Sequence, residues 1–253
     1  MKLQDAVIVI TGGAQGLGRA TGEFLAGRGA RLALIDVNQQ RLDEAVEACH
    51  KAGGDARGYV CNIADEEAVD ATFDRITGDF GALDGLMNNA GILRDGLLVK
   101  AKDGTVTDRL SLEAWKTVMD VNLTGTFLCG RAAATHMIQL GRPGCIINVS
   151  SLSQAGNIGQ SNYSASKAAV TTLATVWAKE LARYGIRSMA IAPGFIETEI
   201  LNAVKPEQLE KMTSGIPLRR LGKPDEIAST VAFILENNYL SGRVIEVDGA
   251  LRL

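Results

Sequence analysis

Short apolar runs alternate with longer amphipathic segments along the whole chain, and this alternation most constrains the fold. The runs are rich in Val, Ile and Leu, which is typical of strands buried on both faces of a parallel sheet. The segments between them space their apolar residues three and four apart, the period of a helix packed on a sheet. The expected strands are 6–10, 31–35, 56–60, 83–87, 145–149, 186–191 and 243–247. The expected helices are 18–28, 39–52, 66–76, 112–140, 164–183 and 224–235.

This pattern predicts an α/β chain with one doubly wound Rossmann fold over residues 1–253. Right-handed crossovers between parallel strands place helices on both faces of the sheet, which we expect to have seven strands. One segment, residues 92–110, has no clear period and is polar in its second half. We expect it to form an extended surface loop with a small hairpin around Asp103-Gly104.

The composition excludes several classes of function. With 26 basic and 29 acidic side chains, the chain has a net charge of −3 and no basic field that would attract nucleic acid or anionic lipid. No apolar run approaches the roughly 18 residues of a membrane span. Two histidines and four scattered cysteines disfavour both a zinc site and a Ser-His-Asp hydrolase. We expect a cytoplasmic protein without a nucleic-acid, membrane or metal partner.

A glycine-rich turn, Thr11-Gly-Gly-Ala-Gln-Gly-Leu-Gly18, follows the first expected strand and opens the first expected helix. Glycines let the backbone approach a pyrophosphate, and the helix N-terminus presents free N–H groups and a positive dipole end to it. A plain tight turn is the alternative, but the position between strand and helix favours a dinucleotide site. The expected contacts come from Gly12, Gln15, Gly16, Leu17 and Gly18.

The second expected strand is followed by Asp36, 18 residues beyond Gly18. A carboxylate at this place can accept hydrogen bonds from both ribose hydroxyls of NAD, whereas a 2′-phosphate would meet like charge at a cost of about 1–3 kcal/mol. Gln15 and the residues that follow Asp36, Val37-Asn38, supply no cation for such a phosphate. Capping of the next helix by Asp36 is the alternative. We predict NAD(H) as the cofactor in preference to NADP.

Tyr163 and Lys167 stand four positions apart at the start of an apolar helix. Residues at this spacing share a helix face, so the ammonium can lie near the phenol. A close positive charge lowers the pKa of a tyrosine from about 10, which would make it a useful acid and base near neutral pH. In isolation an ordinary surface pair on a helix is the favoured interpretation, so a catalytic role depends on the glycine turn.

Together with that turn, the pair resembles the short-chain dehydrogenase/reductase family. The matching motifs occur in the order expected of that family and cover the whole chain. They are Thr11–Gly18, Asn88-Asn-Ala-Gly91, Asn122, Val149-Ser-Ser151, Tyr163-x-x-x-Lys167, Pro193-Gly194 and Val247-Asp-Gly249. Overall the chain looks most similar to the 3-oxoacyl carrier-protein reductase branch of the family.

The resemblance implies that Tyr163 exchanges a proton with the substrate oxygen, while Lys167 lowers the pKa of Tyr163 and binds the nicotinamide ribose. It also implies that Asn122 holds a water for proton relay and that a serine polarises the substrate oxygen. Counting 13 residues back from the tyrosine points to Ser150, whereas counting from the strand end points to Ser151. We select Ser151, because a loop absorbs a deletion more easily than a buried strand does.

The resemblance implies further cofactor contacts at the ends of later strands. The pair after the third strand would lie beside the adenine, the small residues after the fourth would admit a ribose, and the group after the sixth would line the nicotinamide. These residues are Asn62, Ile63, Asn89, Ala90, Gly91, Pro193, Gly194, Ile196 and Thr198. We interpret Asn88 as a side-chain brace of its loop.

These features predict an NAD(H)-dependent oxidoreductase that interconverts a secondary alcohol, or a 3-hydroxyacyl group, and its ketone by hydride transfer. The alternative is a 3-oxoacyl-[acyl-carrier-protein] reductase. Such reductases mostly use NADPH, against Asp36, and carry basic residues at the site mouth, where Arg142 matches one position and Tyr184 departs from another. A catalytically idle nucleotide-sensing or scaffold protein is a remote alternative, because a fold does not fix a function.

The substrate is therefore expected to be a small ketone or alcohol or an acyl thioester. Residues 195–216 are expected to form a substrate lid, with apolar residues that include Ile200, Leu201 and Met212. The resemblance implies a homotetramer assembled through the helices expected at 112–140 and 164–183 and through the last strand.

Overall fold

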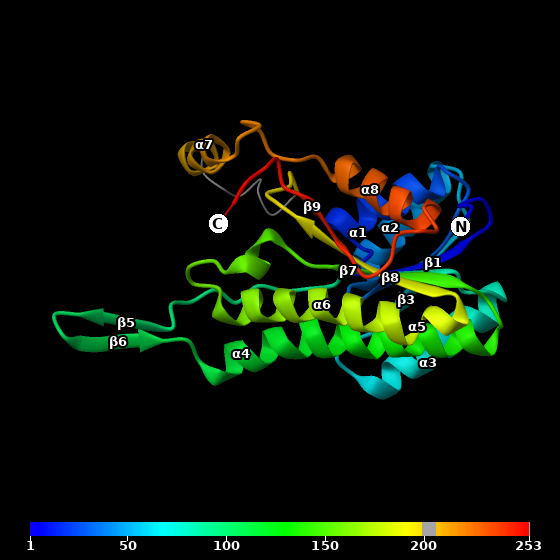
Figure 1. The fold of residues 1–253 in the computed structure, drawn as a ribbon, viewed down its shortest axis with the longest axis horizontal. Coiled ribbons are helices and arrows are strands. Elements are labelled where there is room, and N and C mark those ends of the chain that lie inside the picture. Colours follow the sequence, from blue (N-terminus) through cyan, green and yellow to red (C-terminus); the bar gives the residue numbers. More distant parts are fainter. Residues whose placement is uncertain (199–205, 253) are drawn as a thin grey trace.

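The computed structural model describes residues 1–198 and 206–252, and its centre is one seven-stranded sheet (Figure 1). The strand order is β3-β2-β1-β4-β7-β8-β9, and all neighbours pair in parallel. The chain order reverses between β1 and β4, so the crevice at the carboxyl ends of these strands is the expected ligand site of a doubly wound sheet. The predicted single α/β fold with seven parallel strands is confirmed.

The elements match the expected ones closely. The sheet strands are β1 (Val7–Thr11), β2 (Arg31–Asp36), β3 (Ala56–Val60), β4 (Gly85–Asn88), β7 (Gly144–Val149), β8 (Ile186–Pro193) and β9 (Val244–Val247). The α-helices are α1 (Gly16–Ala26), α2 (Gln39–Lys51), α3 (Glu66–Phe80), α4 (Leu112–Met119), α5 (Thr126–Gln139), α6 (Ser161–Glu180), α7 (Pro206–Gly215) and α8 (Pro224–Glu236). Shorter turns are the π-helical η1 (Asp120–Gly125) and the 3-10 turns η2 (Leu152–Ala155) and η3 (Ala182–Tyr184).

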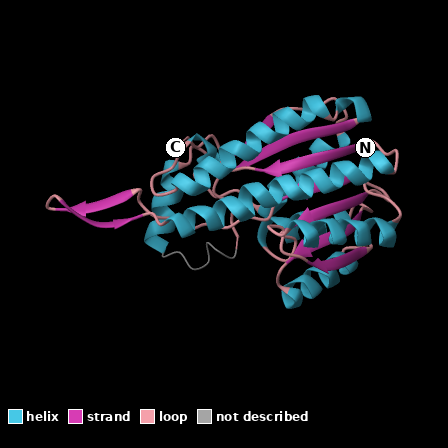
Figure 2. Cartoon of the chain, turned by 90° about the horizontal axis from the view of Figure 1, so that it is seen from below, coloured by secondary structure: helices cyan, strands magenta, loops and turns pink. Residues whose placement is uncertain are grey.

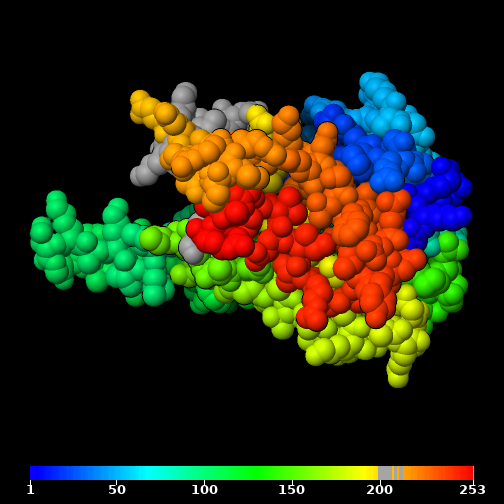
Figure 3. All heavy atoms as spheres, turned by 45° about the horizontal axis from the view of Figure 1, so that its top comes forward, coloured from blue at the N-terminus to red at the C-terminus, as the bar shows by residue number. Residues whose placement is uncertain are grey.

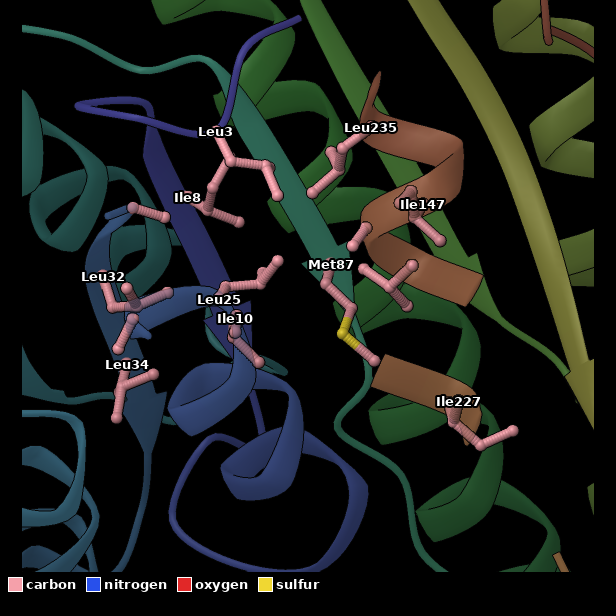
Figure 4. Packing of buried hydrophobic residues seen from close by; sticks show 14 of the residues in the cluster. Leu3, Ile8, Ile10, Leu25, Leu32, Leu34, Met87, Ile147, Ile227 and Leu235 are labelled. Carbon is pink, nitrogen blue, oxygen red and sulfur yellow. The ribbon is translucent and has the colours of Figure 1, made fainter. Parts of the chain in front are cut away.

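Helices cover both faces of the sheet, and the central strand β1 contributes to two separate cores. Ile8 and Ile10 pack with α1, α2 and α8, while Val7 and Val9 pack with α3, α5 and α6. Successive side chains of a strand point to opposite faces, so a run that is apolar at every position supplies both cores. Figure 4 shows the first core, and Figure 2 shows helices of the second layer lying across the strands.

The helix expected at 112–140 is interrupted by the π turn η1, which separates α4 from α5. Within this turn the carbonyl oxygen of Asn122 accepts a hydrogen bond from Thr126 Oγ1 at 2.8 Å. The apolar spacing on either side did not reveal the interruption, because one widened turn changes the helical period little. Such π turns occur often at functional sites.

The segment between β4 and α4 carries a hairpin, β5 (Val99–Lys102) with β6 (Thr105–Arg109), which confirms the predicted hairpin. Its turn residues Asp103 and Gly104 have φ values of +50° and +79°, as a two-residue hairpin turn of the primed type requires. Figures 1 and 3 show it projecting from the body of the molecule, and every strand residue in it is exposed. We call residues 99–109 the arm.

The predicted lid at 195–216 contains α7, which lies at the same end of the molecule as the arm (Figure 1). At its end Ile216 is buried and packs in a small cluster with Leu152 and Leu251. Ile200 and Leu201, expected in this lid, lie outside the described residues. In the part of the chain that the structure describes, no helix combines the length and the apolar character that crossing a bilayer requires.

Candidate active site

The glycine turn between β1 and α1 is shaped as a phosphate cradle. Gly12 and Gly16 have φ values of +64° and +55°, and a Cβ on Gly18 would lie 2.1 Å from the oxygen of Gly12. A Cβ on Gly16 would meet no atom within 4 Å, so this glycine borders open space. Helix α1 receives no side-chain cap from Gln15, which leaves N–H groups of its first turn for an external anion.

A cavity of about 260 Å³ adjoins this turn. Its lining joins the first turn of α1 to the loop after β8, two predicted parts of the cofactor site. The lining residues are Gly16, Arg19, Ala20, Glu23, Glu197, Thr198 and Pro224. The cavity adjoins the uncapped start of α1, which can bind an anion, and its charged lining residues are one arginine and two glutamates.

Asp36 lies at the end of β2 beside the glycine turn. Its Oδ2 accepts a hydrogen bond from Ala14 N at 3.2 Å, and its Oδ1 accepts one from Asn38 N at 3.1 Å. The cap of α2 is Asn38, so Asp36 is not the capping residue. The guanidinium of Arg41 donates to Gln15 Oε1, which brings to the turn a cation that the residues adjacent to Asp36 did not indicate.

Asn89 connects the end of β4 to the glycine turn. Its amide nitrogen donates to the carbonyl oxygens of Thr11 and Gly12, both at 3.1 Å. Its neighbour Asn88 is buried and donates to Asn148 Oδ1 at 3.0 Å, in agreement with its interpretation as a brace. The side chain of Asn89 braces the turn as well, and its N–H donates to Thr11 Oγ1 at 3.0 Å. The predicted cofactor contact of Asn89 stays a prediction.

The residues expected beside the adenine differ in exposure. Asn62 is exposed after β3, and its Oδ1 accepts a hydrogen bond from Ala64 N at 3.1 Å. Ile63 is buried and belongs to the second core. It packs so closely on η1 that a Cβ on Gly125 would lie 2.7 Å from Ile63 Cδ1.

After β8 the backbone is held tightly where the nicotinamide contacts were predicted. Gly194, directly after Pro193, donates its N–H to Val247 O at 2.9 Å, and a Cβ on Gly194 would lie 2.7 Å from Asp248 Cα. Ile196 is buried in the first core. These contacts fix the backbone of the loop after β8, which leads to Thr198 in the lining of the cavity.

Lys167 is buried in the first turns of α6 beside Tyr163. Its Nζ donates to Val149 O at 2.8 Å and lies 5.6 Å from the centre of the Tyr163 ring. Burial lowers the pKa of Lys167 to about 8. A Cβ on Gly91 would lie 3.4 Å from Lys167 Nζ and 3.3 Å from Asn122 Oδ1, so only a small residue lets these groups come together.

The structure brings Ser151, and not Ser150, to the tyrosine. The Ser151 side chain hydrogen-bonds with Tyr163, and its Oγ accepts from Ser153 N at 3.1 Å at the start of η2. Ser150 is buried behind it and donates its hydroxyl to Lys167 O at 2.8 Å. This geometry supports the selection of Ser151.

The pKa of Tyr163 is raised above its usual range, in the direction opposite to the one expected from the sequence. Burial of the phenol is the main cause, the negative charge of Asp95 adds to it, and the hydrogen bond with Ser151 acts in the other direction. Lys167 is not among the groups that shift this pKa here, and its ammonium donates to Val149 O. The predicted effect of Lys167 on Tyr163 stays a prediction.

Asn122 anchors the start of the long segment after β4. Its Oδ1 accepts from Ile92 N at 2.8 Å and its Nδ2 donates to Ile92 O at 3.1 Å. The side chain thus pairs with one peptide unit as a neighbouring strand would. The predicted relay water at Asn122 stays a prediction.

The first part of the 92–110 segment forms a wall of the site. Gly96 N donates to Gly159 O at 2.8 Å, and Gln160 Nε2 donates to Asp95 Oδ2 at 3.1 Å. Asn162 Nδ2 donates to Arg94 O at 2.9 Å. The sequence analysis missed these residues, although two amides just before Tyr163 were a signal that polar partners face this turn.

Replacing Asp95 by Asn is expected to lower the pKa of Tyr163, because the substitution removes the negative charge that opposes the phenolate. In the oxidation direction, the limb of the kcat/KM profile that reports loss of the Tyr163 proton should move to lower pH. The neutral amide still offers Gln160 an acceptor. Asp103→Asn at the tip of the arm is the control, and an equal shift there would contradict a local effect.

Arg142 lies at the opposite edge of the sheet, which corrects its expected place at the site mouth. Its Nε and Nη2 donate to Asp84 Oδ1 at 2.9 and 2.7 Å, and Asp84 Oδ2 accepts from Val7 N at 2.9 Å. Arg142 precedes β7, Asp84 precedes β4 and Val7 begins β1, so all three lie where strands begin. Ser151 instead follows the carboxyl end of β7. Tyr184 precedes β8 and so lies at this opposite edge too.

Comparison with known proteins agrees with this geometry. A family model described as enoyl-(acyl carrier protein) reductase matches residues 12–251. The 3-oxoacyl-[acyl-carrier-protein] reductase FabG of Thermotoga maritima is 40% identical over 99% of both chains. The human 3-oxoacyl-[acyl-carrier-protein] reductase is 40% identical over 98% of this chain and 99% of its own. An acetoacetyl-CoA reductase from Synechocystis is 38% identical over 98% of this chain and 97% of its own.

The chain belongs to the short-chain dehydrogenase/reductase family. It is an oxidoreductase that acts on CH–OH or ketone groups with a nicotinamide cofactor.

Proposed function

We propose that the protein reduces the ketone of a 3-oxoacyl thioester to the 3-hydroxyacyl group with NADH, and catalyses the reverse oxidation. The observation that carries this proposal is the convergence of Ser151, Tyr163 and Lys167, with Lys167 beside Gly91 in the segment that follows β4. The substrate class is supported by relatives whose names specify 3-oxoacyl and acetoacetyl thioesters. A plain secondary alcohol or ketone is the second candidate, because the same groups serve any such carbonyl.

In this proposal the hydroxyls of Ser151 and Tyr163 converge on the substrate oxygen. Tyr163 donates its proton to that oxygen during reduction, and Ser151 stabilises the developing negative charge. The phenol of Tyr163, whose pKa burial raises, is protonated at neutral pH and so carries the proton to be donated, while a pKa nearer neutrality would make it a stronger acid. Lys167, with a pKa of about 8, is mostly protonated there and supports the donor by its charge. The nicotinamide ring supplies or accepts the hydride when the cofactor is bound.

The residues that would hold the cofactor are those of the glycine turn, Asp36 and the loop ends that adjoin the cavity. Asp36 favours NADH, because its carboxylate can accept from two ribose hydroxyls and repels a 2′-phosphate. Arg41 lies near the turn, where its guanidinium donates to Gln15 Oε1. NADH is therefore the proposed cofactor in spite of this arginine.

The double substitution Asp36→Ala with Val37→Arg is expected to shift the Kd ratio of NADPH to NADH at least tenfold toward NADPH. The change removes the like charge and places a cation at Val37, which is 67% exposed. Quenching of protein fluorescence gives both Kd values without turnover. Asp43→Ala on the exposed side of α2 is the control, and an unchanged ratio in the double variant would refute the role of Asp36.

The function itself is tested by following NADH and NADPH oxidation at 340 nm with acetoacetyl thioesters and a set of plain ketones. We expect NADH-linked turnover of the thioesters. Turnover of plain ketones alone would overturn the thioester proposal and leave the second candidate. No turnover of any carbonyl or alcohol, with NADH still bound, would favour a nucleotide-sensing protein.

We further propose a cytoplasmic homotetramer assembled through α4–α5 and α6. Support comes from α6, whose outer side carries small side chains such as Ala165, Ala168 and Ala169 that are not fully buried in the single chain. Small residues let helices of two copies approach closely.

A further inference from the structure

Two buried side chains of α6 hold the backbone of Tyr163 from both sides. Asn162 Oδ1 accepts a hydrogen bond from Tyr163 N at 2.8 Å, and Ser166 Oγ donates one to Tyr163 O at 2.7 Å. Both Asn162 and Ser166 are 0% exposed. Tyr163 lies in the first turn of α6, where backbone N–H groups have no partner within the helix. The residue that carries the phenol is therefore fixed by side chains at its N–H and at its carbonyl oxygen.

The side chain of Asn162 also bonds to two segments outside its own helix. Its Nδ2 donates to Arg94 O at 2.9 Å and to Ala114 O at 3.3 Å. Ala114 belongs to the first turn of α4, and α4 packs against α6 (Figure 1). A residue that served only to satisfy the end of a helix would need the bond to Tyr163 N alone. The further bonds join Tyr163 to the segment after β4 and to α4.

Ser166 is connected to the same segment through Asn122. The Ser166 Oγ accepts from Asn122 Nδ2 at 3.3 Å, and the Asn122 side chain pairs with the N–H and the carbonyl oxygen of Ile92. Serines in helices often bond to a carbonyl one turn earlier, as Ser166 does to Tyr163. Here the same buried oxygen also receives a donor from η1. Both side chains that hold Tyr163 therefore lead to residues 92–94.

The other end of this segment is fixed to the glycine turn. Thr11, the last residue of β1 and the first of the turn, accepts two hydrogen bonds at its Oγ1. The donors are Asn89 N at 3.0 Å and Ala90 N at 3.1 Å. We call residues 89–94 the strap. Because hydrogen bonds hold the strap at both ends, it sets the distance between the glycine turn and the start of α6.

We propose that Asn162 and Ser166 are positioning residues, which place the Tyr163 hydroxyl relative to the glycine turn by tying its backbone to the strap. A proton is transferred only when its donor and acceptor lie within hydrogen-bond reach, so a small displacement of the phenol slows the transfer. Binding of the cofactor depends on other groups and is left intact. The inference rests on the proposed function, in which Tyr163 is the proton donor.

Ser166→Ala tests the proposal with the loss of a single buried oxygen atom, and alanine is the best residue for the interior of a helix. We expect kcat for thioester reduction to fall by about 10–10²-fold, while KM and the Kd for NADH stay within twofold. Ser164→Ala is the matched control, because in the described part of the chain the buried Ser164 hydroxyl has no hydrogen-bond partner. The control should leave all three quantities within twofold. Equal kcat values for the two variants would overturn the role of Ser166.

A double-mutant cycle separates positioning of Tyr163 from general support of the site. In the Tyr163→Phe background there is no hydroxyl left to place, so Ser166→Ala should lower the remaining single-turnover rate by less than twofold. A loss as large as in the wild-type background would mean that Ser166 acts independently of Tyr163, which contradicts the proposal.

Asn162→Ala tests the bonds to the strap, and we expect it to lower kcat at least as strongly as Ser166→Ala. Amide hydrogen exchange gives a readout without turnover, because Tyr163 N loses its acceptor and should exchange at least tenfold faster. Asn237→Ala is the control, since Asn237 Oδ1 accepts from Tyr239 N at 3.1 Å at the far end of α8. Unchanged circular dichroism shows that the variants fold. Unchanged exchange at Tyr163, or a Kd for NADH raised as much as kcat is lowered, would overturn the role of Asn162.

The same measurements distinguish failure of this inference from failure of the proposed function. Full turnover in Tyr163→Phe would contradict the proposed function itself. An inactive Tyr163→Phe beside fully active Ser166→Ala and Asn162→Ala would leave the function standing and overturn the positioning role alone. Should Asn162→Ala fail to fold, Ser166→Ala and its cycle still decide the inference.

Discussion

Tyr163→Phe is expected to reduce kcat by about 10²–10⁴-fold while leaving the Kd for NADH within twofold of the wild-type value. The substitution removes one oxygen atom, the proposed donor to the substrate, and keeps the ring that lies 5.6 Å from Lys167 Nζ. The phenylalanine ring fills the space that the tyrosine ring occupied, so the packing around this part of α6 is preserved. Steady-state kinetics with the best thioester and fluorescence titration with NADH together measure both quantities.

Tyr184→Phe is the matched control, because Tyr184 lies at the opposite edge of the sheet and its hydroxyl contacts the exposed Arg183. It should leave both kcat and NADH affinity unchanged. If Tyr163→Phe weakened NADH binding as strongly as it slowed turnover, the tyrosine would be a binding residue and the proposed proton transfer would be wrong.

Ser151→Ala is expected to lower kcat by about 10²–10³-fold, the usual effect of removing one donor to a developing oxyanion. KM should change less, because the hydrogen bond to the substrate oxygen strengthens as charge develops. The loss of the Oγ that caps η2 adds a destabilisation of about 1 kcal/mol, which thermal unfolding would report separately.

Ser150→Ala separates the two serines. Its hydroxyl donates to Lys167 O at 2.8 Å and accepts from Thr171 Oγ1 at 2.9 Å, so it joins β7 to α6. We expect a loss of unfolding free energy of about 1–3 kcal/mol, since these two hydrogen bonds are lost, and a smaller loss of kcat than in Ser151→Ala. A larger loss of kcat in Ser150→Ala would reverse the assignment of the two serines.

The sequence predicted the centre of the sheet well because the strands β1, β4 and β7 are buried on both faces. A run such as Val7–Thr11 must be apolar nearly throughout when helices pack on either side, and this signal does not depend on distant residues. The glycine turn was equally readable, since its backbone angles and the close contact at Gly18 admit no larger side chain.

Features that arise from contacts between distant segments were not predictable in the same way. The side chain of Asn122, in the π turn, pairs with the peptide of Ile92, and the raised pKa of Tyr163 depends on burial and on Asp95. Arg142 was placed at the wrong edge because a position matched by resemblance carries no information about its partner, here Asp84. The choice between Ser150 and Ser151 required the three-dimensional structure. Counting back from Tyr163 selected Ser150, whereas counting from the end of the strand selected Ser151.

The Asp84–Arg142 pair lies at the edge of the sheet opposite to the groups proposed for catalysis. This pair and the backbone of Val7 fasten the edge at which the strands begin, whereas the groups proposed for catalysis lie where the strands end. Substitutions at such distant sites usually have additive effects on stability. The loops at the carboxyl edge can therefore be exchanged to alter what the protein accepts, while its resistance to unfolding is adjusted independently at the other edge.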